Sequence, residues 1–225
     1  MLYRLVFFAP LCVACAFPQA RSIFIDTTTN NTVGSKGDAK PAGNVKAKPH
    51  GPETTPAGLK YYLDLEKPGG EIEQVTTSRV FHNGERVRLH FTTNMDGYVY
   101  ILQRSPNGGS QALFPNAQLG VTDNFAHAGQ DMTLPSKRSW FTFDDHAGEE
   151  RLMVFVTPLR VDQIERLALG SANVDATETA TLARSIPPRG TRSLMIEVDD
   201  KSEQKAEYAV NKTGSLALEI VMQHR

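Results

Sequence analysis

The chain of 225 residues carries 24 Lys and Arg against 25 Asp and Glu, so its formal net charge is −1. This near-neutral balance, with no run of basic residues, gives no electrostatic reason for binding nucleic acid or an anionic membrane surface. Apolar residues make up 40% and charged residues 22% of the sequence, which is the composition of an ordinary globular protein. We therefore expect no nucleic-acid partner.

The first 16 residues have the order of a cleavable signal peptide. Arg4 supplies a positive charge, and an almost continuous apolar run over residues 5–17 follows it. At 13 residues the run is shorter than the about 20 that span a bilayer, so we expect no transmembrane span in the mature chain. Ala14 and Ala16 favour cleavage after residue 16, and cleavage as late as residue 20 is the alternative. The sequence therefore predicts an exported protein, periplasmic or secreted.

Both cysteines of the sequence, Cys12 and Cys15, lie in this leader. Cleavage at either position removes them, which would leave the mature chain without a disulfide, a thiol nucleophile or cysteine-bound zinc. Cys15 follows Ala14, a small residue of the kind that precedes the lipidated cysteine of bacterial lipoproteins, although Cys12 stands where a leucine is usual. Lipidation of Cys15, giving a lipid-anchored protein, is therefore the alternative.

Residues 17–58 are predicted to form a disordered polar linker. Thr, Asn, Lys, Pro and Gly dominate from about residue 27 onward, and Ile23, Phe24 and Ile25 are exceptions near the start. Such a segment cannot bury enough apolar surface to offset the entropy lost on ordering. It would act as a tether between the domain and a membrane or partner.

Residues 59–225 are predicted to form a mainly β globular domain. Segments with the alternation or the apolar runs of strands recur about every 8–12 residues, separated by turns rich in Asn and Gly. The predicted strands cover residues 59–66, 72–81, 86–91, 98–102, 112–114, 140–143, 152–156, 194–198, 208–210 and 216–222. Helical spacing occurs at residues 161–168, and residues 171–190 are compatible with a second short helix. This pattern predicts an antiparallel β-sandwich or a barrel-like domain with one or two short helices.

Several short blocks in the middle of the chain occur in the order of a known family. The blocks are NGERVRL at 83–89, DGYVYIL at 96–102, ALFPN at 112–116, DN at 123–124, AGQ at 128–130, LP at 134–135 and the strand at 150–158. Together, over roughly residues 80–158, they resemble domain-of-unknown-function family 4384. The resemblance implies a β-rich bacterial module, often found in exported or multidomain proteins, with no catalytic residues assigned. No functional residue is therefore carried over.

The polar residues of the sequence form no pattern of a catalytic or metal site. His82 and His90 are eight positions apart, which is not a ligand spacing, and Asp144 and Asp145 would point to opposite faces of a strand. No serine lies in a nucleophile motif such as Gly-x-Ser-x-Gly. We therefore expect no enzymatic activity, no cofactor and no metal ion.

Trp140 is the candidate binding residue. Aromatic side chains on an exposed strand face can stack against a sugar ring or receive a peptide side chain. Phe141, Phe143 and Tyr100 are expected in the core because aromatic residues in alternating strands are usually buried. Trp140 is less readily buried, and we place it on a possible binding face.

These observations predict a non-catalytic accessory or protein-interaction module of the bacterial cell envelope, whose partner is another envelope protein. The alternative is a carbohydrate-binding module that uses Trp140, and a third hypothesis is an envelope hydrolase. An apolar groove or an open sheet edge would favour a protein partner. A flat exposed aromatic row would favour a glycan, and a polar pocket with convergent carboxylates would favour the hydrolase.

Overall fold

The computed structural model describes residues 23–24, 55–104, 110–169, 177, 194–199 and 205–225. The predicted signal peptide, Cys15 and most of the predicted linker lie outside these ranges. So does the segment 171–190, apart from residue 177.

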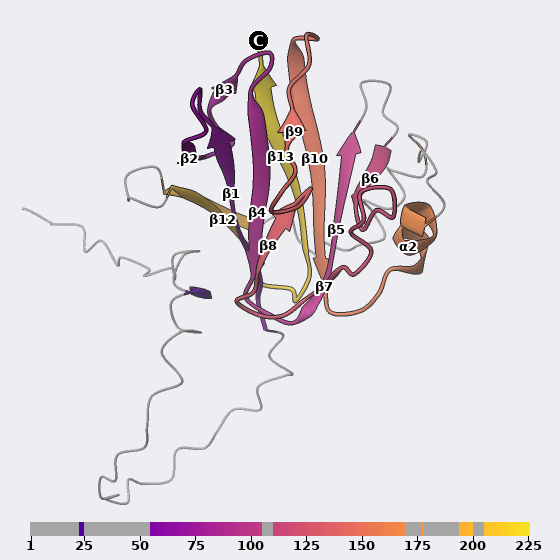
Figure 1. The fold of residues 1–225 in the computed structure, drawn as a ribbon. Helices are drawn as coiled ribbons and strands as arrows, with labels where there is room; N and C mark the ends of the chain where they lie inside the picture. The colour runs from indigo at the N-terminus through magenta and orange to yellow at the C-terminus, as the bar shows by residue number, and fades with distance from the viewer. Residues whose placement is uncertain (1–22, 25–54, 105–109, 170–176, 178–193, 200–204) are drawn as a thin grey trace, which may run out of the picture.

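Two mainly antiparallel sheets pack face to face (Figure 1), which confirms the mainly β prediction and shows a sandwich rather than a closed barrel. The first sheet has the order β11-β12-β1-β4-β8, with β2 also paired to β1 and β9 to β4. Its strands are β1 (Ala57–Glu66), β2 (Ile72–Val75), β4 (Arg86–Thr93), β8 (Asp131–Leu134), β9 (Phe141–Thr142), β11 (Leu194–Asp199) and β12 (Ala206–Asn211).

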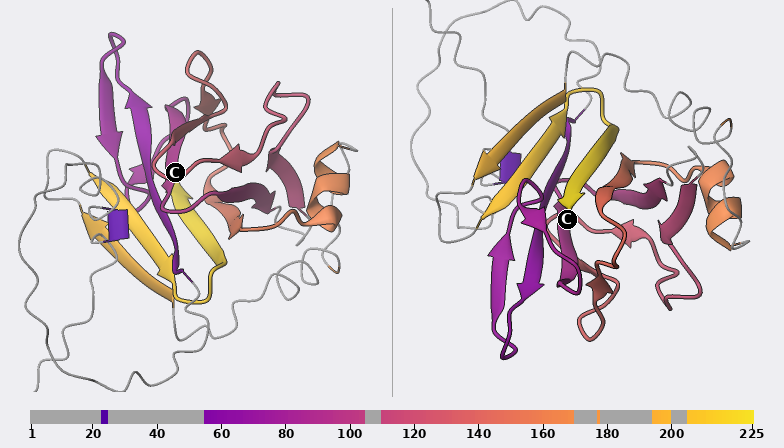
Figure 2. Two further views of the ribbon diagram at one scale, coloured as in Figure 1. Left: turned by 90° about the horizontal axis from the view of Figure 1, so that it is seen from below. Right: turned by 90° about the horizontal axis from the view of Figure 1, so that it is seen from above.

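The second sheet has the order β3-β13-β10-β5-β6, with β7 also paired to β5. Its strands are β3 (Val80–Phe81), β5 (Gly97–Arg104), β6 (Ser110–Phe114), β7 (Phe125–Ala126), β10 (Gly148–Thr157) and β13 (Leu216–His224). Only the pairing of β13 with β3 is parallel in the part of the chain described. The helix α2 (Asp162–Leu169) lies beyond β5 and β6, far from β12 (Figure 2).

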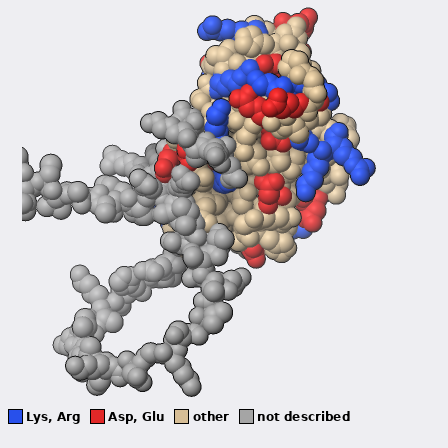
Figure 3. Space-filling view, turned by 60° about the vertical axis from the view of Figure 1, so that its left-hand side comes forward, with Lys and Arg blue, Asp and Glu red and all other residues tan. Residues whose placement is uncertain are grey.

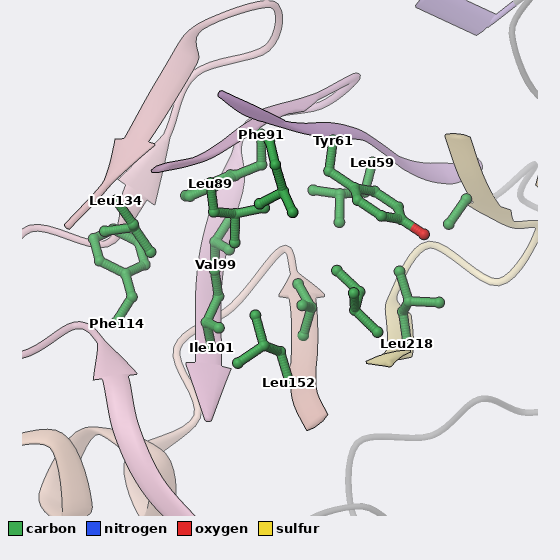
Figure 4. Close-up of a cluster of buried hydrophobic side chains, with 14 of the residues drawn as sticks. Leu59, Tyr61, Leu89, Phe91, Val99, Ile101, Phe114, Leu134, Leu152 and Leu218 are labelled. Atoms are coloured by element: carbon green, nitrogen blue, oxygen red, sulfur yellow. The ribbon is translucent and has the colours of Figure 1, made fainter. Parts of the chain in front are cut away.

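The core lies between the two sheets because alternate residues of each strand point inward. From Leu59 to Glu66 of β1 the inward residues are buried and the residues between them are half-buried, as the alternation predicted. Figure 4 shows side chains from both sheets meeting in this layer. Among them are Leu59, Tyr61, Leu89 and Phe91 from the first sheet, and Val99, Ile101, Leu152 and Leu218 from the second.

The predicted strand at residues 72–81 is in fact two strands in different sheets. The backbone N–H and the hydroxyl of Thr77 both donate to the Glu207 carboxylate, at 2.7 and 2.6 Å. This buried contact holds the turn between β2 and β3, where the chain passes from one sheet to the other. A second difference is the presence of β7 and β8 in a region where no strand was predicted.

The helix α2 covers part of the outer face of the second sheet. Ile164 packs with Tyr100 and Phe155 in a separate apolar cluster. The Tyr100 hydroxyl donates to Glu165 at 3.0 Å and accepts the backbone N–H of Val161 at 3.0 Å. Tyr100 can therefore be buried because its hydroxyl group has hydrogen-bond partners. The prediction that Tyr100 is a core residue is confirmed.

Two residues of the predicted linker pack against the first sheet. Ile23 and Phe24 contact an apolar cluster on its outer face that includes Tyr208 and Val210 of β12. The rings of Phe24 and Tyr208 meet edge to face, with their centroids 5.6 Å apart.

Replacement of Phe114 by Ala tests the packing of the core. Phe114 is fully buried and meets Phe91 edge to face at 5.8 Å. The cavity left by truncation should lower the free energy of unfolding by about 3–5 kcal/mol, which corresponds to a fall in Tm of about 6 °C or more. Leu159→Ala is the control, because Leu159 is 75% exposed. Thermal melts with equal Tm for the two variants would contradict the packing described.

Candidate functional site

A set of aromatic and basic side chains lies on the outer face of the first sheet. Strand β4 buries Val87, Leu89 and Phe91, so the residues between them point outward. With two neighbours they form what we call the outer-face cluster. Its members are Tyr62, Arg86, Arg88, His90 and Trp140.

Trp140 reaches this face through the pairing of β9 with β4. The register sets Thr142 opposite Arg86 and Phe141 opposite Val87, which brings the preceding residue, Trp140, beside Arg88. The guanidinium carbon of Arg88 lies 4.0 Å from the centroid of the indole, and that of Arg86 lies 5.5 Å from it. Trp140 is half-buried. These are cation–π distances, each worth roughly 0.5–1 kcal/mol at an exposed site.

Carboxylates of β1 orient the two arginines. Asp64 and Glu66 stand opposite Arg88 and Arg86 in the antiparallel register. The Arg88 Nη2 donates to Asp64 Oδ2 at 2.9 Å, and its Nη1 donates to the carbonyl oxygen of Lys137 at 2.7 Å. Arg86 forms an ion pair with Glu66 at 2.5 Å. Cross-strand pairs of this kind hold long side chains in a single arrangement.

His90 is fixed from three sides. Its ring stacks on that of Tyr62, with centroids 4.6 Å apart and planes 5° from parallel. Its Nε2 lies 3.0 Å from Asp64 Oδ2, and its Nδ1 lies 3.0 Å from Asp131 Oδ2. The Thr133 hydroxyl lies 3.4 Å from the same Nδ1. Together with the stacking on Tyr62, these contacts set the orientation of the ring, so this part of the outer face is a rigid surface.

Lysine and arginine side chains lie directly beside acidic ones on the side of the molecule drawn in Figure 3. In the first sheet and the turn after β1, Arg86 and Arg88 each form an ion pair with a carboxylate, and Lys67 pairs with Glu73 at 2.7 Å. A face with both signs interspersed has no strong field of one sign. Within the described ranges, no helix is long and apolar enough to cross a membrane.

Three possible metal ligands lie together in the turn between β9 and β10, namely Asp144, Asp145 and His146. No other such group is found among the residues that the structure describes. All three side chains are exposed. The backbone N–H of His146 donates to Asp144 at 2.9 Å, and this bond holds the pKa of Asp144 below its usual range. The hydrogen bond accounts for the local geometry without an ion, because an Asp side chain commonly bonds the backbone two residues on.

A polar pocket of about 280 Å³ lies between the loop after β6 and the start of α2. It contains two carboxylates, those of Asp123 and Glu165. Asp123 accepts the backbone N–H of Phe125 at 3.1 Å, while Glu165 accepts hydrogen bonds from Tyr100 and from Arg160 at 3.0 and 2.8 Å. Both acids are therefore engaged with the chain itself, which does not favour the hydrolase hypothesis.

The structure confirms the predicted core positions of Phe143 and Phe141. Phe143 is buried and Phe141 packs against the core, whereas Trp140 lies on the outer face. No pattern in the sequence indicated that Tyr62 and His90 would be neighbours of Trp140. The outward alternation of β4 was visible, but the register that aligns this strand with β1 and β9 was not.

The fold and the cluster together define a two-sheet β module with a rigid aromatic and arginine surface. Residues 80–159 match the model of a family described as a domain of unknown function, DUF4384, which confirms the resemblance seen in the sequence. The match includes Arg88, His90 and Trp140, and it excludes Tyr62. No curated protein and no solved structure matches the chain.

Alkaline titration tests the environment of Tyr62. Burial, followed by the negative charges of Asp131 and Asp64, raises the pKa of its phenol to about 12 from the ordinary 10.0. The contribution of Tyr62 to stability is therefore fully present below pH 10 and is lost as the pH rises towards 12, because the unfolded chain ionises first. Tyr62→Phe has no such proton, so its free energy of unfolding should fall less over this range than that of the unmodified chain.

Urea unfolding at several pH values from 9 to 12 measures this difference, and absorbance at 295 nm follows the phenolate directly. The two proteins compared at pH 7 provide the control. Parallel loss of stability in both proteins between pH 10 and 12 would show that Tyr62 titrates normally.

Proposed function

We propose that this chain is an exported, non-catalytic accessory module of the bacterial cell envelope that binds another envelope protein through the outer-face cluster. The observation that carries the proposal is the stacking of Trp140 on Arg88 beside the stacked pair of His90 and Tyr62. Tryptophan, tyrosine and arginine are the residues most enriched at the energetic centres of protein interfaces.

The order of the cluster supports this proposal. Ion pairs and stacking already fix its long side chains, so less conformational entropy would be lost on binding than for free side chains. Ile72 adds an apolar side chain that is 50% exposed, and it stands opposite Glu66, which pairs with Arg86. A surface with rigid aromatic, arginine and apolar groups suits a protein partner with complementary carboxylates and apolar groups.

The same contacts favour a protein partner over a glycan. Stacking of a sugar requires an open aromatic face. The guanidinium group of Arg88, at 4.0 Å from the indole centroid, covers one face of Trp140. Carbohydrate binding through Trp140 is therefore the second hypothesis.

Trp140→Ala tests the cluster as a binding surface. Loss of an interface centre should weaken capture of the envelope partner about 30-fold or more. The loss of its cation–π contacts should lower stability by only about 1–2 kcal/mol. Arg151→Ala is the matched control, because Arg151 also forms surface ion pairs, with Glu149 and Glu219, but belongs to the second sheet.

Affinity capture from envelope extracts, followed by titration with the purified partner, measures binding, and thermal melts measure stability. Equal capture by the unmodified chain and Trp140→Ala would overturn the role of the cluster. Binding of the unmodified chain to glycans on an array would favour the second hypothesis if Trp140→Ala abolished that binding.

Export predicts a defined mature N-terminus. Cleavage after residue 16 or residue 20 would start the mature chain at Phe17 or Arg21. Mass spectrometry of the protein recovered from periplasmic or secreted fractions should find one of these ends. A lipid adduct on Cys15 would support the lipid-anchored alternative, and intact Met1 in a cytoplasmic fraction would contradict export.

A further inference from the structure

The two sheets enclose an apolar cavity of about 260 Å³ that is partly open to solvent. It lies between β1, β4, β8 and β9 of the first sheet and β5, β6, β10 and β13 of the second. Its apolar wall consists of Leu63, Val87, Leu89, Ile101, Leu113, Leu134, Phe141, Phe143, Leu152 and Met222. Figure 4 shows Leu89, Ile101, Leu134 and Leu152 in this layer. Protein interiors rarely contain voids of this size, and apolar clefts with few polar groups are the usual form of a ligand site.

The rim of the cavity is polar and acidic. It consists of Gln103, Thr142, Asp144 and Glu150. The side-chain amide of Gln103 donates to Glu150 at 3.0 Å, so its donor group is directed at a neighbouring rim residue. What the rim offers to a ligand is therefore mainly carboxylate, carbonyl and hydroxyl oxygens, which accept hydrogen bonds and attract positive charge.

Basic residues near the rim in sequence point elsewhere. Arg104 and Arg151 follow Gln103 and Glu150, and successive residues of a strand lie on opposite faces of the sheet. On that opposite face both arginines form ion pairs with Glu219, at 3.3 and 3.2 Å. No lysine or arginine is among the described residues that line the cavity. A ligand with an anionic end would therefore meet the carboxylates of Asp144 and Glu150 and no lysine or arginine on the wall of the cavity. The imidazoles near Asp144 are those of His146, which lies in the exposed turn, and His224.

We propose that this cavity binds a single aliphatic chain that ends in an ammonium group, with the chain between the sheets and the cation at Asp144 and Glu150. The cavity sets the size of the apolar part. An apolar protein cavity of about 150 Å³ accommodates benzene, and by the same ratio this cavity accepts roughly ten carbon atoms. This site is separate from the outer-face cluster, and its occupation does not depend on the proposed function.

Calorimetric titration of the purified full chain tests the ligand class. The probes are decylammonium, decanoate and decanol, each below its micellar concentration. Decylammonium should bind with a 1:1 stoichiometry and at least tenfold more tightly than either of the others. From hexyl to decyl, each added methylene should tighten binding by about fourfold, with no further gain once the cavity is full. Equal affinity for decylammonium and decanol, tighter binding of decanoate, or no binding of decylammonium would overturn the proposal.

Two pairs of matched variants locate the site. Leu113→Trp fills the cavity, whereas Leu119→Trp makes the same change at a side chain outside it that is 40% exposed. Only the first should weaken decylammonium binding tenfold or more. Glu150→Gln and Glu149→Gln remove the same charge, but only Glu150 lines the rim, so only Glu150→Gln should reduce the preference over decanol.

Thermal melts of all four variants show whether each is folded. If Leu113→Trp does not fold, the comparison of Glu150→Gln with Glu149→Gln tests the location of the site by itself. Glu149 forms its bonds with Arg151 and Gln223 on the outer face, which makes it a control for net charge. Equal effects of the two members of either folded pair would overturn the assignment of this site.

Discussion

The antiparallel register between β1 and β4 is the constraint on which the rest of the molecule depends. It aligns Leu63 with Leu89 in the core, and one position along the strands it aligns Asp64 with Arg88 on the outer face. Because the side-chain period of a strand is two, a slip by one residue would bury the charges and expose the leucines. The same register therefore provides a wall of the apolar cavity and the ion pairs of the outer-face cluster.

The strands could be predicted from the sequence because their alternation and their turns are local. The helix near residue 164 and the inward residues of β4 were recognised for the same reason. Two features depended on distant partners. The turn at Thr77 is set by Glu207, which lies 130 positions further on. The outer-face cluster joins Tyr62, His90 and Trp140 through two strand registers, and neither register has a local signature.

The cavity was also beyond prediction from sequence. Apart from Leu134, which was in no predicted strand, the apolar residues on its wall belong to strand patterns that are equally consistent with a filled core. Whether the side chains of two facing sheets meet or leave a space depends on the distance between the sheets and on what closes the open side. Of the candidate residues, Trp140 could be selected because a lone tryptophan in a strand is conspicuous, while Glu150 resembled any solvated acid.

Under the proposed export, the packing of Ile23 and Phe24 beside β12 would determine how far the domain lies from its point of attachment. Because Ile23 and Phe24 lie on the first sheet, only the residues before Ile23 would separate this sheet from the proposed mature N-terminus. With a lipid on Cys15, seven residues would intervene, and a fully extended chain of that length reaches about 25 Å. The first sheet would then lie close to the bilayer, because the effective tether would be short.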